Sequence, residues 1–111
     1  MHWIFQEYKV GNDGSESKIF SFKTFPKYDA FNSWSPEVVV FGDLSDKDGK
    51  IYGRLTDEVR QGKVDMVVHL GDLAYDLHWK NGRVGDSFMR KMEPIAAYVP
   101  YQVAPGNHEE A

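Results

Sequence analysis

The sequence predicts an α/β fold, in which residues 37–111 form a β-α-β-α-β series with a parallel sheet, preceded by a short all-β segment. Three observations support this prediction. Short continuous apolar runs alternate with amphipathic stretches of helical length, and clusters of glycine, proline and small polar residues separate them. Such alternation is typical of parallel sheets whose helices cross over between neighbouring strands. The 111 residues are enough for one small domain with its own core.

The first 27 residues predict β structure only. Ile4, Tyr8 and Val10 lie in a strand-like stretch, turn residues follow at positions 11–15, and residues 19–25 are rich in aromatic and β-branched side chains. We therefore expect a β-hairpin in this segment. Prolines, serines and asparagine then predict a linker over residues 28–36.

Three strands are expected after the linker. Val38–Phe41 is a continuous apolar run, as expected for a buried strand of a parallel sheet, and Met66–Leu70 is a second run of the same kind. Tyr101–Ala104 is a third, shorter strand.

Two helices are expected between these strands. The first is indicated by apolar residues that recur every four positions in a polar setting, and it ends at Gly62. The second covers residues 85–98, has one apolar face and bends at Pro94. The expected apolar faces are Ile51, Leu55 and Val59 on the first helix, and Phe88, Met92 and Ile95 on the second.

Composition excludes several classes of function. The net charge is −4, so we expect no nucleic-acid partner, and phosphate chemistry would need a local positive source such as a metal ion. Because there is no cysteine, disulfides, zinc–thiolate sites and cysteine nucleophiles are excluded. No apolar run is long enough to span a bilayer, and the first residues lack the features of a signal peptide.

Each expected strand is followed by a glycine and by residues that can bind a metal ion. These segments are Gly-Asp at 42–43, Gly-Asp-x-x-Tyr at 71–75 and Gly-Asn-His-Glu at 106–109. The spacing between the first two ligand positions is 72 − 43 = 29 residues, and the next is 107 − 72 = 35. One β-α-β repeat takes roughly 30 residues or more, so the three loops are expected side by side at one edge of the sheet.

The residue types suit a hard metal ion, because two carboxylates, a phenolate and an amide all bind through oxygen. A carboxylate such as Asp72 can bridge two ions. Two ions about 3.5–4 Å apart are an established arrangement for hydrolysing phosphate esters. His69, inside the second strand, is expected to be a core histidine with a local hydrogen bond.

The three motifs, in this order, resemble the metallophosphoesterases. Tyr75, three residues after Asp72, resembles the purple acid phosphatase branch in particular, and residues 34–36 and 81–89 look like the animal iron/zinc acid phosphatases of type 7. The resemblance covers nearly the whole chain. It implies that residues 37–111 are the first part of a metallophosphoesterase α/β sandwich, and that residues 1–27 are the C-terminal strands of a fibronectin-like domain.

By this resemblance, the chain carries part of a dinuclear site for iron(III) and a divalent ion, either zinc, manganese or iron(II). Asp43 and Tyr75 would bind iron(III), Asp72 would bridge the two ions, and Asn107 would bind the divalent ion. His108 would be catalytic, contacting the phosphate or protonating the leaving alkoxide. The implied activity is an acid phosphatase that hydrolyses small phosphate monoesters with a metal-bound hydroxide.

Glu109 would orient its neighbours in this site. The three later histidine ligands of the family lie beyond residue 111, so we expect the chain to be a truncated part of a longer protein. It offers three protein ligands to the first ion and two to the second, counting Asp72 for both. The family is typically secreted or lysosomal, whereas the oligomeric state is not predicted.

Two alternatives stay open. Another metallophosphoesterase, such as a diesterase or protein phosphatase, usually has a histidine two residues after the first aspartate, where this chain has Ser45. The chain could also be an inactive truncated piece, because the later histidine ligands are absent from it.

Overall fold

The computed structural model describes residues 3–27 and 33–110, and the chain divides into two compact units, Met1–Ser35 and Pro36–Ala111. The expected linker lies partly outside the described residues, which do not include 28–32. None of the helices in the described part of the chain is long and apolar enough to cross a membrane.

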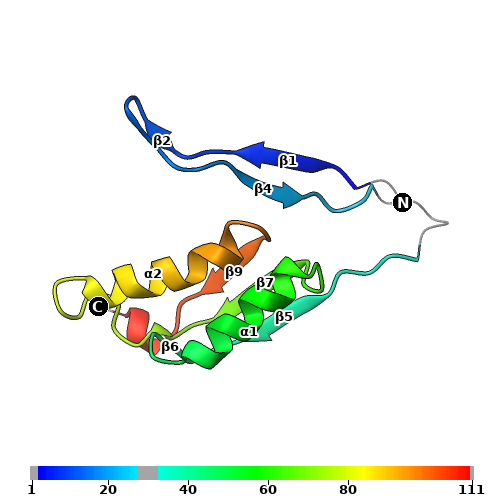
Figure 1. Ribbon diagram of the computed structural model, residues 1–111. Helices are drawn as coiled ribbons and strands as arrows, with labels where there is room; N and C mark the ends of the chain where they lie inside the picture. The colour runs from blue at the N-terminus through cyan, green and yellow to red at the C-terminus, as the bar shows by residue number, and fades with distance from the viewer. Residues whose placement is uncertain (1–2, 28–32, 111) are drawn as a thin grey trace. The chain divides into compact units, whose positions relative to one another are not determined.

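The first unit is the expected hairpin. Strand β1 (Phe5–Tyr8) pairs antiparallel with β4 (Phe20–Lys23), and β2 (Gly11–Asn12) pairs with β3 (Ser15–Glu16) beside the turn (Figure 1). Across the first pair, the ring of Tyr8 stacks on that of Phe20 at 5.5 Å, and Phe20 is buried. The assignment of this hairpin to a fibronectin-like domain stays a prediction.

The second unit is an α/β layer with the expected order of elements. Strands β5 (Val38–Phe41), β7 (Met66–Leu70) and β9 (Tyr101–Ala104) form a parallel sheet with β7 in the centre. Helices α1 (Gly49–Arg60) and α2 (Arg83–Ala96) form the two crossovers. All three strands therefore end at the same edge of the sheet (Figure 1).

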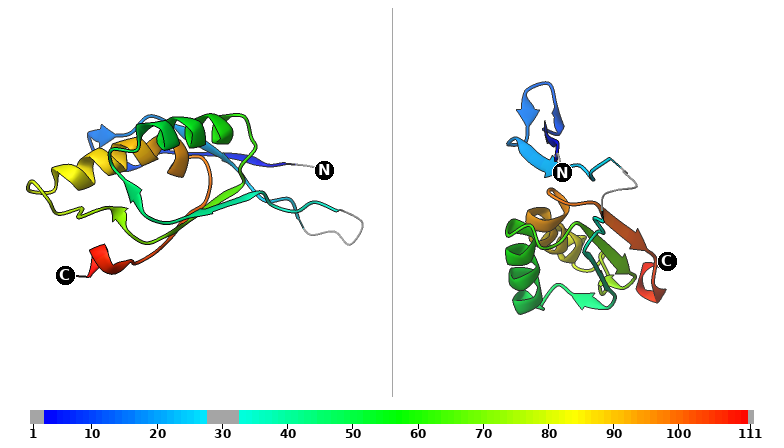
Figure 2. Two further views of the ribbon diagram at one scale, coloured as in Figure 1. Left: turned by 90° about the horizontal axis from the view of Figure 1, so that it is seen from below. Right: turned by 90° about the vertical axis from the view of Figure 1, so that its right-hand side faces the viewer.

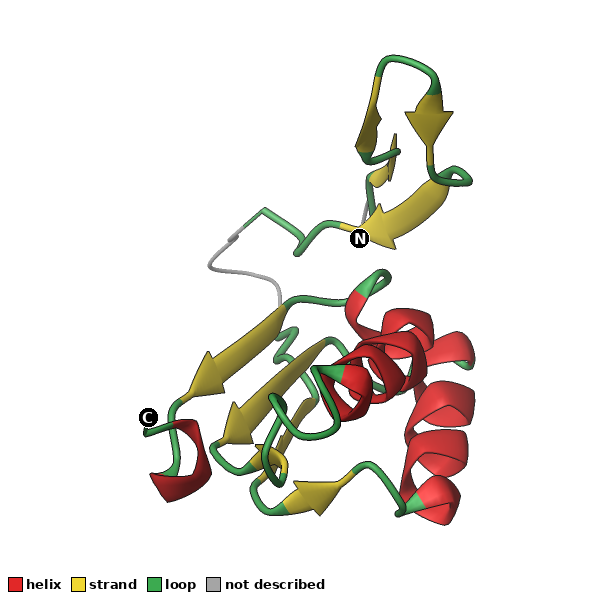
Figure 3. Cartoon of the chain, turned by 90° about the vertical axis from the view of Figure 1, so that its left-hand side faces the viewer, coloured by secondary structure: helices red, strands yellow, loops and turns green. Residues whose placement is uncertain are grey.

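Both helices lie on the same face of this sheet (Figures 2 and 3). On that face Val67 and His69 are fully buried, as is Ile95 of α2. Side chains alternate between the two faces of a strand, so the neighbouring residues point away from the helices. Val38 is 42% exposed and Val40 is 56% exposed. The expectation that β5 is a buried strand is therefore wrong, because the helices of residues 33–110 cover only one face of the sheet.

The apolar stripe of α1 differs from the expected one by one residue. Its buried residues are Tyr52, Leu55 and Val59, whereas Ile51 is 51% exposed. A spacing of four residues advances about 40° beyond a full turn, so a strict four-residue repeat drifts around the helix. Residues separated alternately by three and by four positions, such as Tyr52, Leu55 and Val59, stay on one face. Gly62, with a φ of 69°, follows the end of the helix as expected.

The apolar face of α2 is confirmed, since Phe88, Met92 and Ile95 are its buried residues. The helix begins and ends two residues earlier than the expected range 85–98. Pro94 lies in its last turn, and because proline has no N–H, the helix lacks the hydrogen bond that an amide at position 94 would donate to the carbonyl of Arg90.

Two short strands were not expected from the sequence. Strand β6 (Leu44–Ser45) pairs in parallel with β8 (Leu73–Ala74), so the pairing of β5 with β7 resumes after a bend. The bends lie at Asp43 and Asp72, whose φ angles are 55° and 54°. A two-residue strand has no periodicity that a sequence could reveal. The pairing of β6 with β8 holds the segments that follow β5 and β7 side by side.

Candidate functional site

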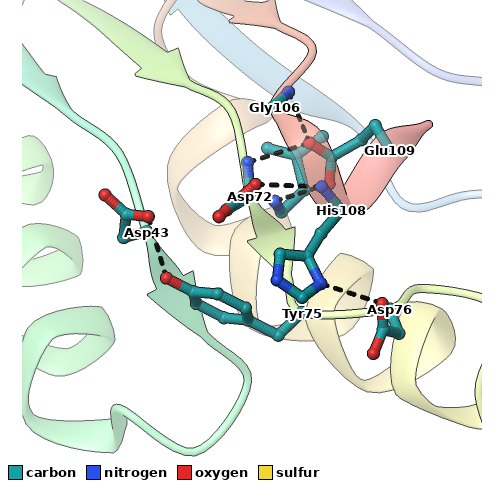
Figure 4. A network of polar contacts seen from close by, with 8 residues as sticks. Asp43, Asp72, Tyr75, Asp76, Gly106, His108 and Glu109 are labelled. Carbon is teal, nitrogen blue, oxygen red and sulfur yellow. Dashed lines mark hydrogen bonds and ion pairs between the residues drawn. The ribbon is translucent and has the colours of Figure 1, made fainter.

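The loops that follow β5, β7 and β9 lie together at the carboxyl edge of the sheet, as predicted (Figures 1 and 4). We name them the first loop (residues 42–48), the second loop (71–82) and the third loop (105–110). The first two are joined by a hydrogen bond of 3.2 Å from the amide of Asp43 to the carbonyl of Gly71. Asp43 and Asp72 both have left-handed backbone angles, which aspartate tolerates better than most residues.

The glycines of the second and third loops allow the two backbones to touch. A Cβ on Gly71 would lie 2.6 Å from the Cα of Gly106, and a Cβ on Gly106 would lie 2.3 Å from Oδ1 of Asp72. Gly71 also has a φ of 84°, a backbone angle that residues with a side chain rarely adopt. These two glycines thus put the second and third loops in direct backbone contact.

Glu109 fastens the second and third loops together. Its Oε2 accepts hydrogen bonds from the amides of Asp72 (2.8 Å) and Gly106 (2.7 Å), and its Oε1 accepts one from Leu73 (2.8 Å). Burial acts to raise the pKa of Glu109, but the three amide bonds outweigh it and lower this pKa below the usual value. The carboxylate form is thus stabilised, and Glu109 orients the backbone that carries Asp72.

Asp72 is the most enclosed of the predicted ligands, with 7% of its surface exposed. Its Oδ1 accepts a hydrogen bond of 3.2 Å from the amide of His108. The side chain of Asp72 therefore lies between the second and third loops (Figure 4).

Tyr75 and Asp43 meet across the first and second loops. The phenol of Tyr75 donates a 2.8 Å hydrogen bond to Oδ1 of Asp43, and Asp43 itself is exposed (Figure 4). This bond, followed by desolvation and the charges of Asp43 and Asp72, raises the pKa of Tyr75 to about 12. The structure thus brings together two residues that were predicted to bind the same ion.

His108 packs against the same region. Its ring lies edge-on to the ring of Tyr75, with centroids 4.8 Å apart and planes at 70°. Its Nδ1 lies 3.0 Å from Oδ1 of Asp76, and this hydrogen bond raises the pKa of His108 despite an opposing effect of burial. Asp76 was missed by the sequence analysis, because nothing in the spacing of the motifs shows where the His108 ring points.

Asn107 is near the other candidates in the chain but is not joined to them. It begins the short 3-10 helix η1 (Asn107–Glu109), its side chain is exposed, and it makes no hydrogen bond with the described residues. Nor do three or more histidine, aspartate or glutamate side chains form a metal-binding group within residues 3–27 and 33–110. The candidate set instead combines carboxylates with a phenol and an amide.

The expectation for His69 is confirmed. It is fully buried, and its Nδ1 shares a hydrogen bond of 2.6 Å with the hydroxyl of Tyr101. Burial lowers its pKa, although the charges of Glu109, Asp43 and Asp72 act in the opposite direction. His69 thus belongs to the core beneath the site.

Comparison with known proteins identifies the family. Residues 36–111 match the model of the calcineurin-like phosphoesterases, which covers the sheet, both helices and all three loops. The chain belongs to this family. Within it, the chain is 47% identical over 103 residues to acid phosphatase type 7 of Homo sapiens and 42% identical over 104 residues to that of Danio rerio. These alignments cover 93% and 94% of the chain, and 23% of each relative.

A solved structure agrees with this assignment. The purple acid phosphatase PPD1 from seeds of yellow lupin, Lupinus luteus, superposes with a TM-score of 0.58 and 31% sequence identity. The match covers 85% of this chain and 18% of the lupin chain. The mixed α/β fold is therefore that of the purple acid phosphatases, and the chain spans about a quarter of the length of the curated relatives it matches.

Proposed function

We propose that this phosphoesterase chain contributes the first part of a dinuclear metal site to an acid phosphatase that hydrolyses small phosphate monoesters. The observation that carries the proposal is the contact between Tyr75 and Asp43. A phenol from the second loop and a carboxylate from the first meet at 2.8 Å, beside the enclosed carboxylate of Asp72. Family membership and the type 7 relatives support the same activity.

The geometry of this contact fits a shared cation. Two oxygen atoms that bind one hard cation must lie close together, and the Tyr75 and Asp43 oxygens are 2.8 Å apart. The proton now shared between them would be released as the phenol became a ligand, because metal binding requires the deprotonated form. We propose iron(III) here, with zinc, manganese or iron(II) as the second ion.

Each residue would then have a defined task. Asp43 and Tyr75 would hold the first ion, Asp72 would lie between the two, and Asn107 would turn its amide oxygen toward the second. When bound, the pair of ions would supply an activated water and balance charge on the phosphoryl oxygens. His108 would contact the phosphate or carry a proton to the leaving oxygen. Glu109 would keep the second and third loops together during catalysis.

Ser45 favours the monoesterase over a diesterase or a protein phosphatase. Those enzymes usually have a histidine at this position. Here the amide of Ser45 donates to Oδ2 of Asp48 at 3.0 Å, and its hydroxyl accepts from the amide of Lys47 at 3.2 Å. Ser45 thus makes its hydrogen bonds within its own turn.

The experiment is a substrate comparison with the iron-loaded protein expressed from the complete gene. We expect turnover of p-nitrophenyl phosphate and little turnover of bis(p-nitrophenyl) phosphate. Asp72→Asn should lower kcat by at least roughly 10²-fold, since the carboxylate is proposed to bind both ions. Asp57→Ala, on exposed α1 surface, is the matched control and should behave as wild type.

Two results would contradict the proposal. Preferred turnover of the diester would indicate that the protein is a diesterase. A protein that contains iron but hydrolyses neither substrate would contradict the proposed phosphatase activity. We also propose a secreted or lysosomal location, which cell fractionation would refute by finding the protein only in the cytosol.

A further inference from the structure

We propose that Lys91 of α2 is a positioning residue that holds the first loop by its backbone, and so keeps Asp43 where it meets Tyr75. The role of Asp43 as a metal ligand rests on the proposed function, whereas the contact of Lys91 with the loop is a property of the chain itself. Lys91 lies outside the three sequence motifs, on the helix that precedes β9.

The first step is the set of groups around the ammonium of Lys91. Its Nζ donates a hydrogen bond to the backbone carbonyl of Asp46, and it lies 3.9 Å from Oδ2 of the same residue. It also lies 5.7 Å from the ring centroid of Tyr52 on α1, within the range of a cation–π contact. Lys91 therefore connects α2 with both α1 and the first loop.

The second step is that the packing of α2 fixes the base of this side chain. Phe88 and Met92 are buried, and the ring of Phe88 packs edge-on against that of Tyr52, with 6.5 Å between centroids. Lys91 follows Phe88 by three positions, so it lies beside this buried contact between the helices. Its side chain is 38% exposed, so its aliphatic part runs along the protein while its charge reaches the loop.

The third step concerns the other hydrogen bonds of the first loop. Among the described residues, they run to the second loop or stay within residues 45–52. The turn that carries Asp46 is closed on itself, because the amide of Ser45 donates to Oδ2 of Asp48 and the amide of Asp48 to the carbonyl of Ser45. Lys91 thus supplies the hydrogen bond that ties this turn to α2.

The fourth step is the charge of the loop. Asp43, Asp46 and Asp48 all lie within residues 43–48, together with one exposed lysine, Lys47. Carboxylates this close in the chain repel one another. A cation that reaches the loop from α2 offsets part of this repulsion, so Lys91 favours the compact loop in both respects.

Hydrogen exchange measures this role without activity. In the protein from the complete gene, mass spectrometry of peptides that cover residues 42–48 reports how often the first loop opens. Lys91→Met keeps an unbranched apolar side chain but removes the charge and the N–H donors. We expect the first loop of this variant to exchange about tenfold faster, as for the loss of one partly exposed hydrogen bond with a charged donor. The second and third loops should change little.

Three further variants isolate the contact. Lys91→Arg keeps a cation and N–H donors, so it should restore most of the protection. Lys50→Met removes the same charge from an exposed position at the start of α1, and is the matched control that should behave as wild type. Asp46→Asn removes the carboxylate but leaves the carbonyl that Lys91 binds, so its effect should be less than about twofold.

A second readout uses the iron-loaded protein. Lys91→Met should lose iron to a chelator about tenfold faster than the wild type, at the lower end of the range for groups that orient metal ligands. Lys91→Arg should again restore most of this loss, and Lys50→Met should have no effect.

The outcomes separate this inference from the proposed function. It is overturned if Lys91→Met leaves the exchange of the first loop unchanged, if it speeds all three loops equally, or if Asp46→Asn has the larger effect. Release of iron at the wild-type rate from folded Lys91→Met would also overturn it. A wild-type protein that binds no iron would instead refute the proposed function, and hydrogen exchange would still decide whether Lys91 holds the first loop.

Discussion

The second and third loops of the site are joined by close packing of two glycines and by the carboxylate of Glu109, whereas the first loop is joined to the second by a short strand pairing and one exposed side-chain pair. Gly71 and Gly106 pack against each other, and the carboxylate of Glu109 accepts three amides across that contact. The first loop is held to the second by the pairing of β6 with β8, by an amide bond of 3.2 Å from Asp43 to Gly71 and by the Tyr75–Asp43 hydrogen bond. Part of the site is thus set by the fold, and the rest depends on groups that a cation would bind directly.

The largest effect should come from closing the space between the second and third loops. Gly71→Ala combines a left-handed backbone with a Cβ 2.6 Å from backbone atoms, and should lower the free energy of unfolding by about 3 kcal/mol. Gly42→Ala is the matched variant in the first loop. Its Cβ would lie 3.1 Å from the Leu70 carbonyl, so we expect a loss of about 1 kcal/mol or less. Urea denaturation measures both, and equal losses would contradict the difference between the loops.

Removing the charge of Glu109 should have the next largest effect. Glu109→Gln weakens three charge-assisted hydrogen bonds and should lower the free energy of unfolding by about 2 kcal/mol. Asp43→Asn removes an exposed charge in the first loop but keeps the acceptor for Tyr75, and should cost about 0.5 kcal/mol or less. If Asp43→Asn proved the more harmful change, the first loop would be the better anchored one.

The pH dependence of stability should distinguish the core from the loops. Burial lowers the pKa of His69, so the unfolded chain binds a proton first as the pH falls below about 6.5, and stability declines from there toward the folded pKa. Glu109, whose pKa is also lowered, loses its contribution as the pH falls below about 4.5.

Two variants test which residue causes the loss of stability in each of these two pH ranges. In denaturation series, His69→Phe should flatten the decline that begins near pH 6.5, and Glu109→Gln should flatten the one below about 4.5. A wild-type stability that stays constant from about pH 7 to 4 would show that neither group titrates as its surroundings require.

The sequence predicted the architecture of the second unit because continuous apolar runs and glycine–aspartate pairs are strong local signals. It placed Asp43, Asp72 and Tyr75 at one edge, where the structure brings them together. It misjudged Val38, Val40 and Ile51, since an apolar residue looks the same whether or not its face is covered. It also missed Asp76, because the partner of a ring depends on rotamers and on left-handed backbone that no periodicity encodes.

Only a small effect on stability is expected from the change most informative about function. Tyr75→Phe removes one partly exposed hydrogen bond and should change the free energy of unfolding little. It would nevertheless remove the proposed phenolate ligand.

The most direct test of the metal site is therefore the visible absorption spectrum of the iron-loaded protein from the complete gene, compared between wild type and Tyr75→Phe. We predict a tyrosinate-to-iron(III) band in the wild type and its loss in Tyr75→Phe, with both proteins folded and containing iron. A wild-type protein that holds iron without this band, or a band that survives in Tyr75→Phe, would contradict the assignment of the first and second loops to an iron(III) site.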